Sequence, residues 1–527
     1  NFVLDVGNTA LMNILQKTLL TTPFMEQLIA SYFHTQAGSA LIHSPNQIKI
    51  EAQDTNVAGT KKLFIHSDEE ATVNSKGLLS VKGEQANNIT NKAESYATSA
   101  QQIHAKCLVH FRPKRGWKGE DYGFDWMRVG DTGVFGDTDY KTIVAKQYDS
   151  AGALVTDVNR YDGTFTPNTN LYTDLEREYT YYTVPWRTVG GSPTKYYCSW
   201  LSMLPTKKVG DSEQPNSVQV LLKIDIEQAP DELRFKEPEG FTVSPKVIRT
   251  QEMPRGVTEQ LLLITCNTPC EENKDLEVFA VTKQADGSEV EQLAGKLCIW
   301  ANAPTKQKKA KMLLIKVTTP PISGRDEETG DTTGQKALFE KYLHQALIDT
   351  EVITEEVNLA IDDTDAIYFL NTYVDFLGRI IAYYDNISHI PSGFVDLQEY
   401  IYNKLKADLS ARGKDPNQYD NLYKAIYLGE KGGHINNIGT FKGLNGYCSG
   451  KFIVLFPSRN NQTAAHEFLH SFDLPHSFTN KEASGNADYT YTVKTTENLM
   501  DYSHLVHEER YSLWKWQWKK ANDSIRS

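Results

Sequence analysis

The stretch "AAHEFLHSFDLPHSF" constrains this chain more than any other, because its histidine spacing fits one local geometry. His466 and His470 are four residues apart, so both imidazoles lie on the same face of a helix. Together with His476 they can bind a single metal ion, and zinc takes nitrogen ligands of this kind. Glu467 lies beside the first histidine, where a carboxylate can accept the proton of a water molecule that attacks a carbonyl carbon. The pattern therefore predicts a zinc site that hydrolyses peptide bonds.

The third histidine requires the helix to end soon after the second. Asp473 favours a turn and Pro475 does not continue a helix comfortably, so the chain bends and returns His476 to the metal. Residue 473 then adopts a left-handed conformation that usually requires glycine, and aspartate tolerates it at a cost of about 1 kcal/mol. HExxH arises by chance in about 0.02 of chains of this composition, and His476 lowers that to about 5 in 10,000. The extended pattern thus favours a metal site over coincidence.

A second motif follows the third histidine. Residues 497–503 read "ENLMDYS", with Met500 lying 24 positions after His476. The two motifs together resemble the metzincin family of zinc proteases, and most of all its pappalysin/cytophagalysin branch, over about residues 310–527. Asp473 departs from the glycine that is usual in this family.

The resemblance implies a role for each residue of the two motifs. It makes His466, His470 and His476 the Zn2+ ligands and Glu467 the general base. Met500 becomes the methionine of a turn beneath the site. Tyr502 becomes a group that approaches the zinc or stabilises the oxyanion. His504 and His507 follow Tyr502 closely and are expected to be exposed or, at most, to support the site.

The final two fifths of the chain alternate between strand and helix patterns. Strands are expected at "MLLIKVTT", "YKAIYLG" and "KFIVLF", and helices over 335–353, 367–384 and 397–412. The strand at 451–456 is expected to be the edge against which an extended substrate pairs. The glycine-rich stretch before it, 429–451, does not fit a phosphate-binding loop and is interpreted as a flexible connector. The last pattern, "ERYSLWKWQWKKAN", predicts a helix whose tryptophans pack in the core.

Short alternating strands dominate the chain before residue 304. Three segments are expected: a β-prism or spike-like segment at 1–105, a β-sandwich-like domain at 106–229 and a small immunoglobulin-like domain at 230–303. The first loosely resembles the shaft of a VgrG-like spike of type VI secretion, which implies a homotrimer; an ordinary β-rich domain is the alternative. The basic run "APTKQKKAK" is interpreted as a solvated linker before the domain at 310–527.

Composition limits the partners. The net charge of −12 makes a nucleic-acid partner unexpected, because such a partner needs a basic surface. No apolar run approaches the roughly 20 residues of a transmembrane helix. The six cysteines lack the spacing of a complete zinc site, and both a disulfide and buried free thiols remain open.

The sequence therefore predicts a multidomain chain with β-rich N-terminal modules and a C-terminal α/β metzincin-like zinc protease domain. The expected activity is endopeptidase cleavage of a protein or peptide. The spike-like start suggests a toxin or effector that secretion-apparatus proteins deliver outside the cell or into a target cell. Two alternatives stay open: an ordinary secreted metalloprotease whose leader has been removed, and a structural or adhesive spike with an inactive zinc site. A trimer would favour the spike and a monomer the secreted enzyme.

Overall fold

The computed structural model shows a chain rich in β-strands that pair in several sheets. It describes residues 102–132, 137–155, 163–209, 212–251, 253–480, 487–506 and 509–525. The chain divides into two units, Asn1–Ala93 and Glu94–Ser527, and every described residue belongs to the second. The spike-like segment expected at 1–105 therefore lies almost entirely outside the described residues, as does His507.

Two sheets form the core of the first half of the described chain. The first is antiparallel, in the order β1 (Cys107–Pro113), β10 (Ser217–Ile226), β14 (Gly256–Cys266) and β12 (Phe241–Ser244). The second has the order β13 (Val247–Arg249), β11 (Glu232–Lys236), β15 (Lys274–Lys283), β16 (Glu289–Ile299), β7 (Ser199–Ser202) and β2 (Gly123–Asp125). Alternate residues of β10 are buried, as expected for a strand with one face on a core.

Gly295 of β16 lies so close to the first sheet that an added Cβ would be 2.2 Å from the carbonyl oxygen of Val109 in β1. This glycine therefore allows the two sheets to pack closely. Strands from both sides of the boundary expected at residues 229 and 230 share these sheets, since β10 pairs with β14 and β7 pairs with β16. The two segments expected to be separate β-domains thus contribute to one pair of packed sheets.

Smaller elements surround these two sheets. Three hairpins pair β3 (Ala145–Tyr148) with β4 (Thr164–Pro167), β5 (Tyr181–Val189) with β6 (Ser192–Tyr197), and β8 (Thr206–Val209) with β9 (Ser212–Pro215). The helices here are α1 (Tyr140–Ile143) and α2 (Thr169–Glu178). The side chain of Asn168 accepts a hydrogen bond from the backbone N–H of Leu171, which fixes the start of α2.

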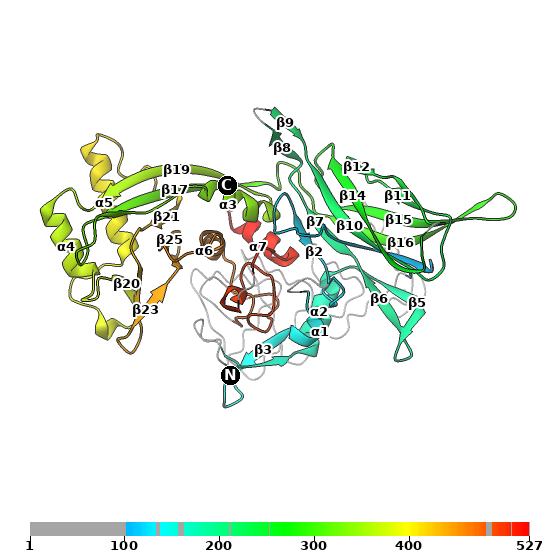
Figure 1. The fold of residues 1–527 in the computed structure, drawn as a ribbon, viewed down its shortest axis with the longest axis horizontal. Coiled ribbons are helices and arrows are strands. Elements are labelled where there is room, and N and C mark those ends of the chain that lie inside the picture. The colour runs from blue at the N-terminus through cyan, green and yellow to red at the C-terminus, as the bar shows by residue number, and fades with distance from the viewer. Residues whose placement is uncertain are drawn as a thin grey trace, which may run out of the picture. The chain divides into compact units, whose positions relative to one another are not determined.

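The second half contains a mixed sheet between two layers of helices (Figure 1). Its strands are β18 (Glu328–Thr329), β17 (Lys308–Thr319), β21 (Tyr423–Tyr427), β25 (Phe452–Leu455) and β24 (Gly446–Ser449) in that order, with β19 (Ile348–Asn358) also on β17. The four strands β19, β17, β21 and β25 are parallel, while β18 and β24 are antiparallel to their neighbours.

The helices divide between the two faces of this sheet. Met312 and Leu314 of β17 share a core with α3 (Gln335–Leu343) and α6 (Thr463–Ser471). Leu313 and Ile315 point to the other face, into a core with α4 (Asp363–Tyr373) and α5 (Leu397–Ala411). Because both faces are covered, β17 is apolar on both sides, as buried parallel strands usually are.

The remaining elements complete the second half. A small sheet contains β20 (Ile380–Tyr384), β22 (Gly432–Ile435) and β23 (Phe441–Leu444). The last helix is α7 (Lys515–Ser524), and the short 3-10 turns are η1 (His344–Ala346), η2 (Ile387–His389) and η3 (Ser503–Val506).

Two expected helices are shorter than predicted, and the last residues of each expected range belong to a strand. The helix expected over 335–353 ends before Leu347, whose φ of 56° is left-handed, and β19 follows. The helix expected over 367–384 ends at Tyr373. The side chain of Asp375 then accepts hydrogen bonds from two backbone N–H groups, Gly378 has a φ of +72°, and β20 begins at Ile380.

Three interpretations of the segments around the sheet were wrong. The glycine-rich stretch 429–451 is not a loose connector, because it contains β22, β23 and β24. The strand at 451–456 is not the edge of the sheet, since β24 pairs along β25 and covers it. The basic run 303–311 is not only a linker, because β17 begins at Lys308 and pairs with β19 from that residue.

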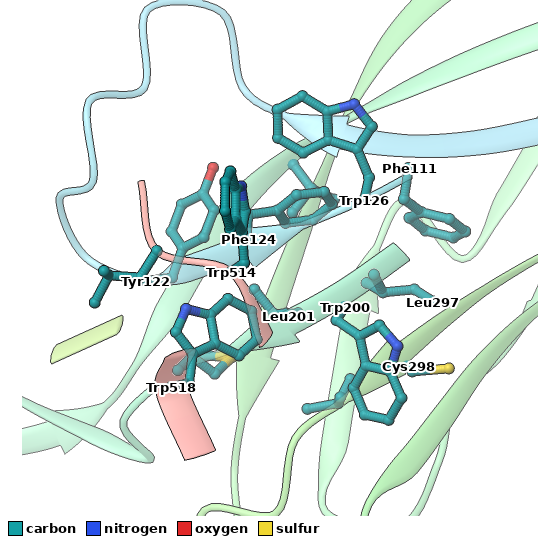
Figure 2. Close-up of a cluster of buried hydrophobic side chains, with 14 of the residues drawn as sticks. Phe111, Tyr122, Phe124, Trp126, Trp200, Leu201, Leu297, Cys298, Trp514 and Trp518 are labelled. Atoms are coloured by element: carbon teal, nitrogen blue, oxygen red, sulfur yellow. The ribbon is translucent and has the colours of Figure 1, made fainter. Parts of the chain in front are cut away.

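A cluster of aromatic side chains joins the C-terminal helix to the first half (Figure 2). Trp514 and Trp518 belong to the same buried cluster as Tyr122, Phe124 and Leu201. Trp518 is fully buried, and its ring centroid lies 6.0 Å from that of Trp300. The prediction that the tryptophans of the last helix pack in the core is therefore confirmed.

The six cysteines are all free thiols, and five of them are buried. Burial raises the pKa of Cys107 to about 12, so this thiol stays protonated. No helix within the described ranges has both the length and the apolar character needed to cross a membrane.

Candidate metal centre

Helix α6 carries the first two histidines. The side chain of Asn460 accepts hydrogen bonds from the backbone N–H groups of Gln462 and Thr463, which supports the start of the helix. Phe468 is buried under the sheet and meets Phe339 of α3 with ring centroids 4.9 Å apart. The packing of this apolar side fixes the rotation of α6.

The turn after α6 has the predicted conformation. Asp473 has a φ of 59°, which is the left-handed region. Its backbone N–H donates to the carbonyl of His470 at 3.1 Å, and the N–H of Leu474 donates to that of Leu469 at 3.0 Å. These bonds close the end of the helix as in a glycine-terminated helix, with aspartate in the glycine position.

The three imidazoles meet at one place. One nitrogen from each of His466, His470 and His476 lies within 4.8 Å of the other two. The Nε2 atoms of His470 and His476 are 3.3 Å apart. Two nitrogens on a tetrahedral zinc ion, at about 2.0–2.1 Å each, are also about 3.3 Å apart. The group can therefore hold a metal ion with little movement, and an all-nitrogen set suits a transition metal better than calcium or magnesium.

Backbone carbonyls orient two of the three histidines. Nδ1 of His466 donates to the carbonyl of Leu499 at 2.8 Å, and Nδ1 of His470 donates to that of Leu474 at 2.8 Å. With Nδ1 protonated in both rings, Nε2 keeps its lone pair for a metal. Burial lowers the pKa of His466 well below its usual value, and Arg510 lowers it further, so this imidazole is neutral.

The motif at 497–503 forms a compact turn against these histidines. Met500 is fully buried, and its carbonyl accepts the backbone N–H of Ser477 at 3.1 Å. The carboxylate of Asp501 accepts the backbone N–H groups of Lys494, Thr496 and Tyr502. The turn is therefore fixed by its own hydrogen bonds and is tied to the residue that follows His476.

Arg510 is a buried cation that sequence reasoning missed. Its Nη1 donates to the carbonyls of Leu499 and Asp501, at 3.3 and 2.9 Å, and lies 3.1 Å from Nδ1 of His466. Burial lowers the pKa of Arg510 to about 10, and the charge of Glu467 acts in the opposite direction. Arg510 is a single arginine in the stretch "HEERYS", and no motif in the sequence indicates that it lies beside His466.

Tyr502 and Glu467 are brought to the same cavity as the ligands. The ring centroid of Tyr502 lies 4.7 Å from that of His476. Both residues line a cavity of about 1340 Å³ that also contains the three histidines. His504 is half-buried, its ring centroid lies 5.9 Å from that of Tyr502, and burial lowers its pKa to about 4.

The edge strand β24 borders this cavity. Gly446, Tyr447 and Cys448 of β24 all line it. The thiol of Cys448 lies 3.2 Å from the hydroxyl of Ser471, next to His470 on α6. The strand that an extended peptide can reach beside the histidines is thus β24 and not the strand at 451–456.

A buried ion-pair network supports the turn from the other half of the unit. Arg128, fully buried, pairs with both Asp125 and Glu497. Asp125 also accepts the hydroxyl of Tyr179 at 2.8 Å and the backbone N–H of Lys515 at 2.9 Å. Glu497, the first residue of the turn motif at 497–503, is therefore held by Arg128, which lies 369 positions earlier in the chain.

Comparison with protein-family models gives no match, and comparison with curated proteins gives none either.

Proposed function

We propose that this chain is a zinc-dependent endopeptidase with a metzincin-like catalytic domain. The observation that carries the proposal is the convergence of three imidazole nitrogens within 4.8 Å in a cavity that also contains Glu467. His466, His470 and His476 would hold the zinc ion, which would supply Lewis acidity for the hydrolysis of a peptide bond.

Residues of the chain have the remaining catalytic roles in this proposal. Glu467 accepts the proton of the attacking water and returns it to the leaving amine. Tyr502, whose ring packs against that of His476, is the residue that we propose stabilises the negative charge on the carbonyl oxygen. The edge strand β24 offers backbone groups to an extended peptide, which explains an endopeptidase better than an enzyme for small substrates.

Metal removal tests this proposal. A chelator should abolish cleavage of a denatured protein, and stoichiometric zinc should restore it. His476→Ala should lower the zinc content and the activity together, because one of the ligands is lost. His389→Ala is a matched control, since His389 is an exposed histidine on η2 outside the cavity lining. Equal zinc content and activity in wild type and His476→Ala would contradict the proposal.

Delivery by a type VI-like spike remains a proposal that rests on the sequence of residues 1–105 alone. It predicts a homotrimer of the full chain in solution. A monomer by sedimentation velocity would favour an ordinary secreted protease instead.

A further inference from the structure

The cavity that contains the three histidines has a basic end. Four lysines line it, namely Lys308, Lys309, Lys311 and Lys451. The first three belong to the start of β17, and Lys451 directly precedes β25. Since β17, β21 and β25 are parallel, their N-terminal ends lie at the same edge of the sheet.

The sheet topology explains why these lysines are accessible. The pairing of β17 with β21 begins at Met312 and Tyr423, so the four residues before Met312 extend beyond the start of β21. Lys309 and Lys311 are exposed and alternate with buried Ala310. The run 303–311 therefore becomes one wall of the cavity.

The charge at this end is only weakly balanced. The carboxylates that line the same cavity are Glu467, beside the histidines, and Asp473, at the end of α6. Asp349 and Glu351 face Lys309 and Lys311 across β17 and β19, but neither lines the cavity.

Within the described part of the chain, no salt bridge joins any of these four lysines to a carboxylate. The nearest partial balance comes from Asp349 on β19, whose pKa is lowered by a hydrogen bond from His344 and further by the charge of Lys309. Lys451 instead donates to the carbonyl of Asn421 at 3.1 Å. In the neighbouring strand β21, burial lowers the pKa of Lys424 to about 8, and the positive charge of Lys451 lowers that pKa further. Because the whole chain has a net charge of −12, this group of four lysines is a local concentration of positive charge and does not follow from composition.

The position of the lysines relative to β24 determines which end of a bound peptide lies near them. Strand β24 runs from Gly446 to Ser449, so its C-terminal end lies next to Gly450 and Lys451 at the basic end. A peptide that pairs antiparallel with β24 has its N-terminal part at that end.

We propose that the lysine-lined end of the cavity selects substrates with aspartate or glutamate on the N-terminal side of the cleaved bond. This inference rests on the proposed peptidase function and adds the substrate class. Exposed charges act through water, so we expect a preference of roughly three- to tenfold for an acidic peptide over its glutamine counterpart, with a strong decrease at high salt.

Cleavage of matched peptides tests the preference. The two substrates carry either three glutamates or three glutamines before one cleavable bond, and a third carries the glutamates after it. The first should have the highest kcat/KM. In the double variant Lys309→Glu and Lys451→Glu the preference should disappear or reverse, whereas Lys207→Glu, an exposed lysine outside the cavity lining, should leave it unchanged. Equal cleavage of all three peptides by the wild type would overturn the inference and leave the peptidase function standing.

Binding provides a readout that needs no turnover. Zinc-loaded Glu467→Ala protein should bind the fluorescent glutamate peptide more tightly than the glutamine peptide, and the lysine double variant should lose the difference. Loss of this difference without loss of thermal stability supports the inference even if no peptide is cleaved. Equal binding of both peptides by Glu467→Ala overturns it.

Discussion

Asp473 occupies a backbone conformation that an L-residue other than glycine adopts at a cost. Its φ of 59° follows from the need to turn the chain between His470 and His476. We expect Asp473→Gly to stabilise the fold by about 0.5–1 kcal/mol, because the strain of a left-handed Cβ is removed. Urea unfolding measures this difference, with Asp473→Ala as the control that should destabilise. A destabilised Asp473→Gly would show that the aspartate side chain has a role of its own.

Arg510 is expected to position the metal ligands and not to touch the substrate. Removing its guanidinium leaves the carbonyls of Leu499 and Asp501 without this donor, and Leu499 is the residue that orients His466. We expect Arg510→Ala to weaken zinc binding by about 10–100-fold, as loss of a group that orients ligands does. Competition with a chelator measures the affinity, and Arg510→Lys should restore part of it. An unchanged zinc affinity would leave Arg510 with a role in packing alone.

The residues of the site were predictable because their chemistry has a fixed spacing. His466, His470 and Asp473 lie within one helix and one turn, so helix geometry and backbone sterics placed them. Arg510 and Glu497 were not predictable, because their partners come from distant segments and no local pattern marks them.

At the scale of elements, the prediction was wrong where glycine is abundant in strands. The stretch 429–451 has the composition of a loop, yet two of its glycines allow β22 to pack closely. An added Cβ would lie 2.1 Å from the ring of Phe456 at Gly432 and 1.9 Å from the carbonyl oxygen of Lys442 at Gly433. Glycine in a strand that approaches other atoms closely has the same sequence signature as glycine in a turn.

This difference can be measured with two alanine substitutions. Gly433→Ala should destabilise the fold by about 1–3 kcal/mol, as overpacking of a closely packed site does. Gly443→Ala in β23 is the matched control, since its nearest neighbour would be a Phe441 atom at 4.0 Å and the change should be close to neutral. Thermal unfolding of both variants provides the comparison. Equal stability of the two variants would mean that β22 does not pack as described.

At the scale of the whole unit, the β-rich half supports the candidate site. The guanidinium of Arg128 is fully buried between Asp125 and Glu497, and removing one member of such a network leaves an uncompensated charge. We expect Arg128→Met to destabilise the protein by about 3–5 kcal/mol and to lower its zinc content. Arg115→Met is the control, because Arg115 pairs with Glu259 while its side chain is 69% exposed, and it should cost less than about 1 kcal/mol. A small effect of Arg128→Met on both stability and zinc content would contradict this coupling.

The division into separate modules was the least predictable feature. Strand patterns gave β-rich segments and an α/β region in the right order, but strand partners depend on contacts that no local pattern contains. The aromatic core that contains Trp514, Trp518, Tyr122 and Phe124 further shows that both halves contribute to one buried cluster.

The most direct test of the proposed mechanism measures zinc and proteolysis in the same preparations of wild type and Glu467→Ala. Because Glu467 is not among the three converging ligands, the variant should keep about one zinc per chain while losing cleavage of a denatured protein. Glu399→Gln, on the exposed side of α5, should retain both zinc and cleavage. Wild-type protein that binds no zinc, or a Glu467→Ala variant that cleaves as fast as wild type, would contradict the proposed mechanism.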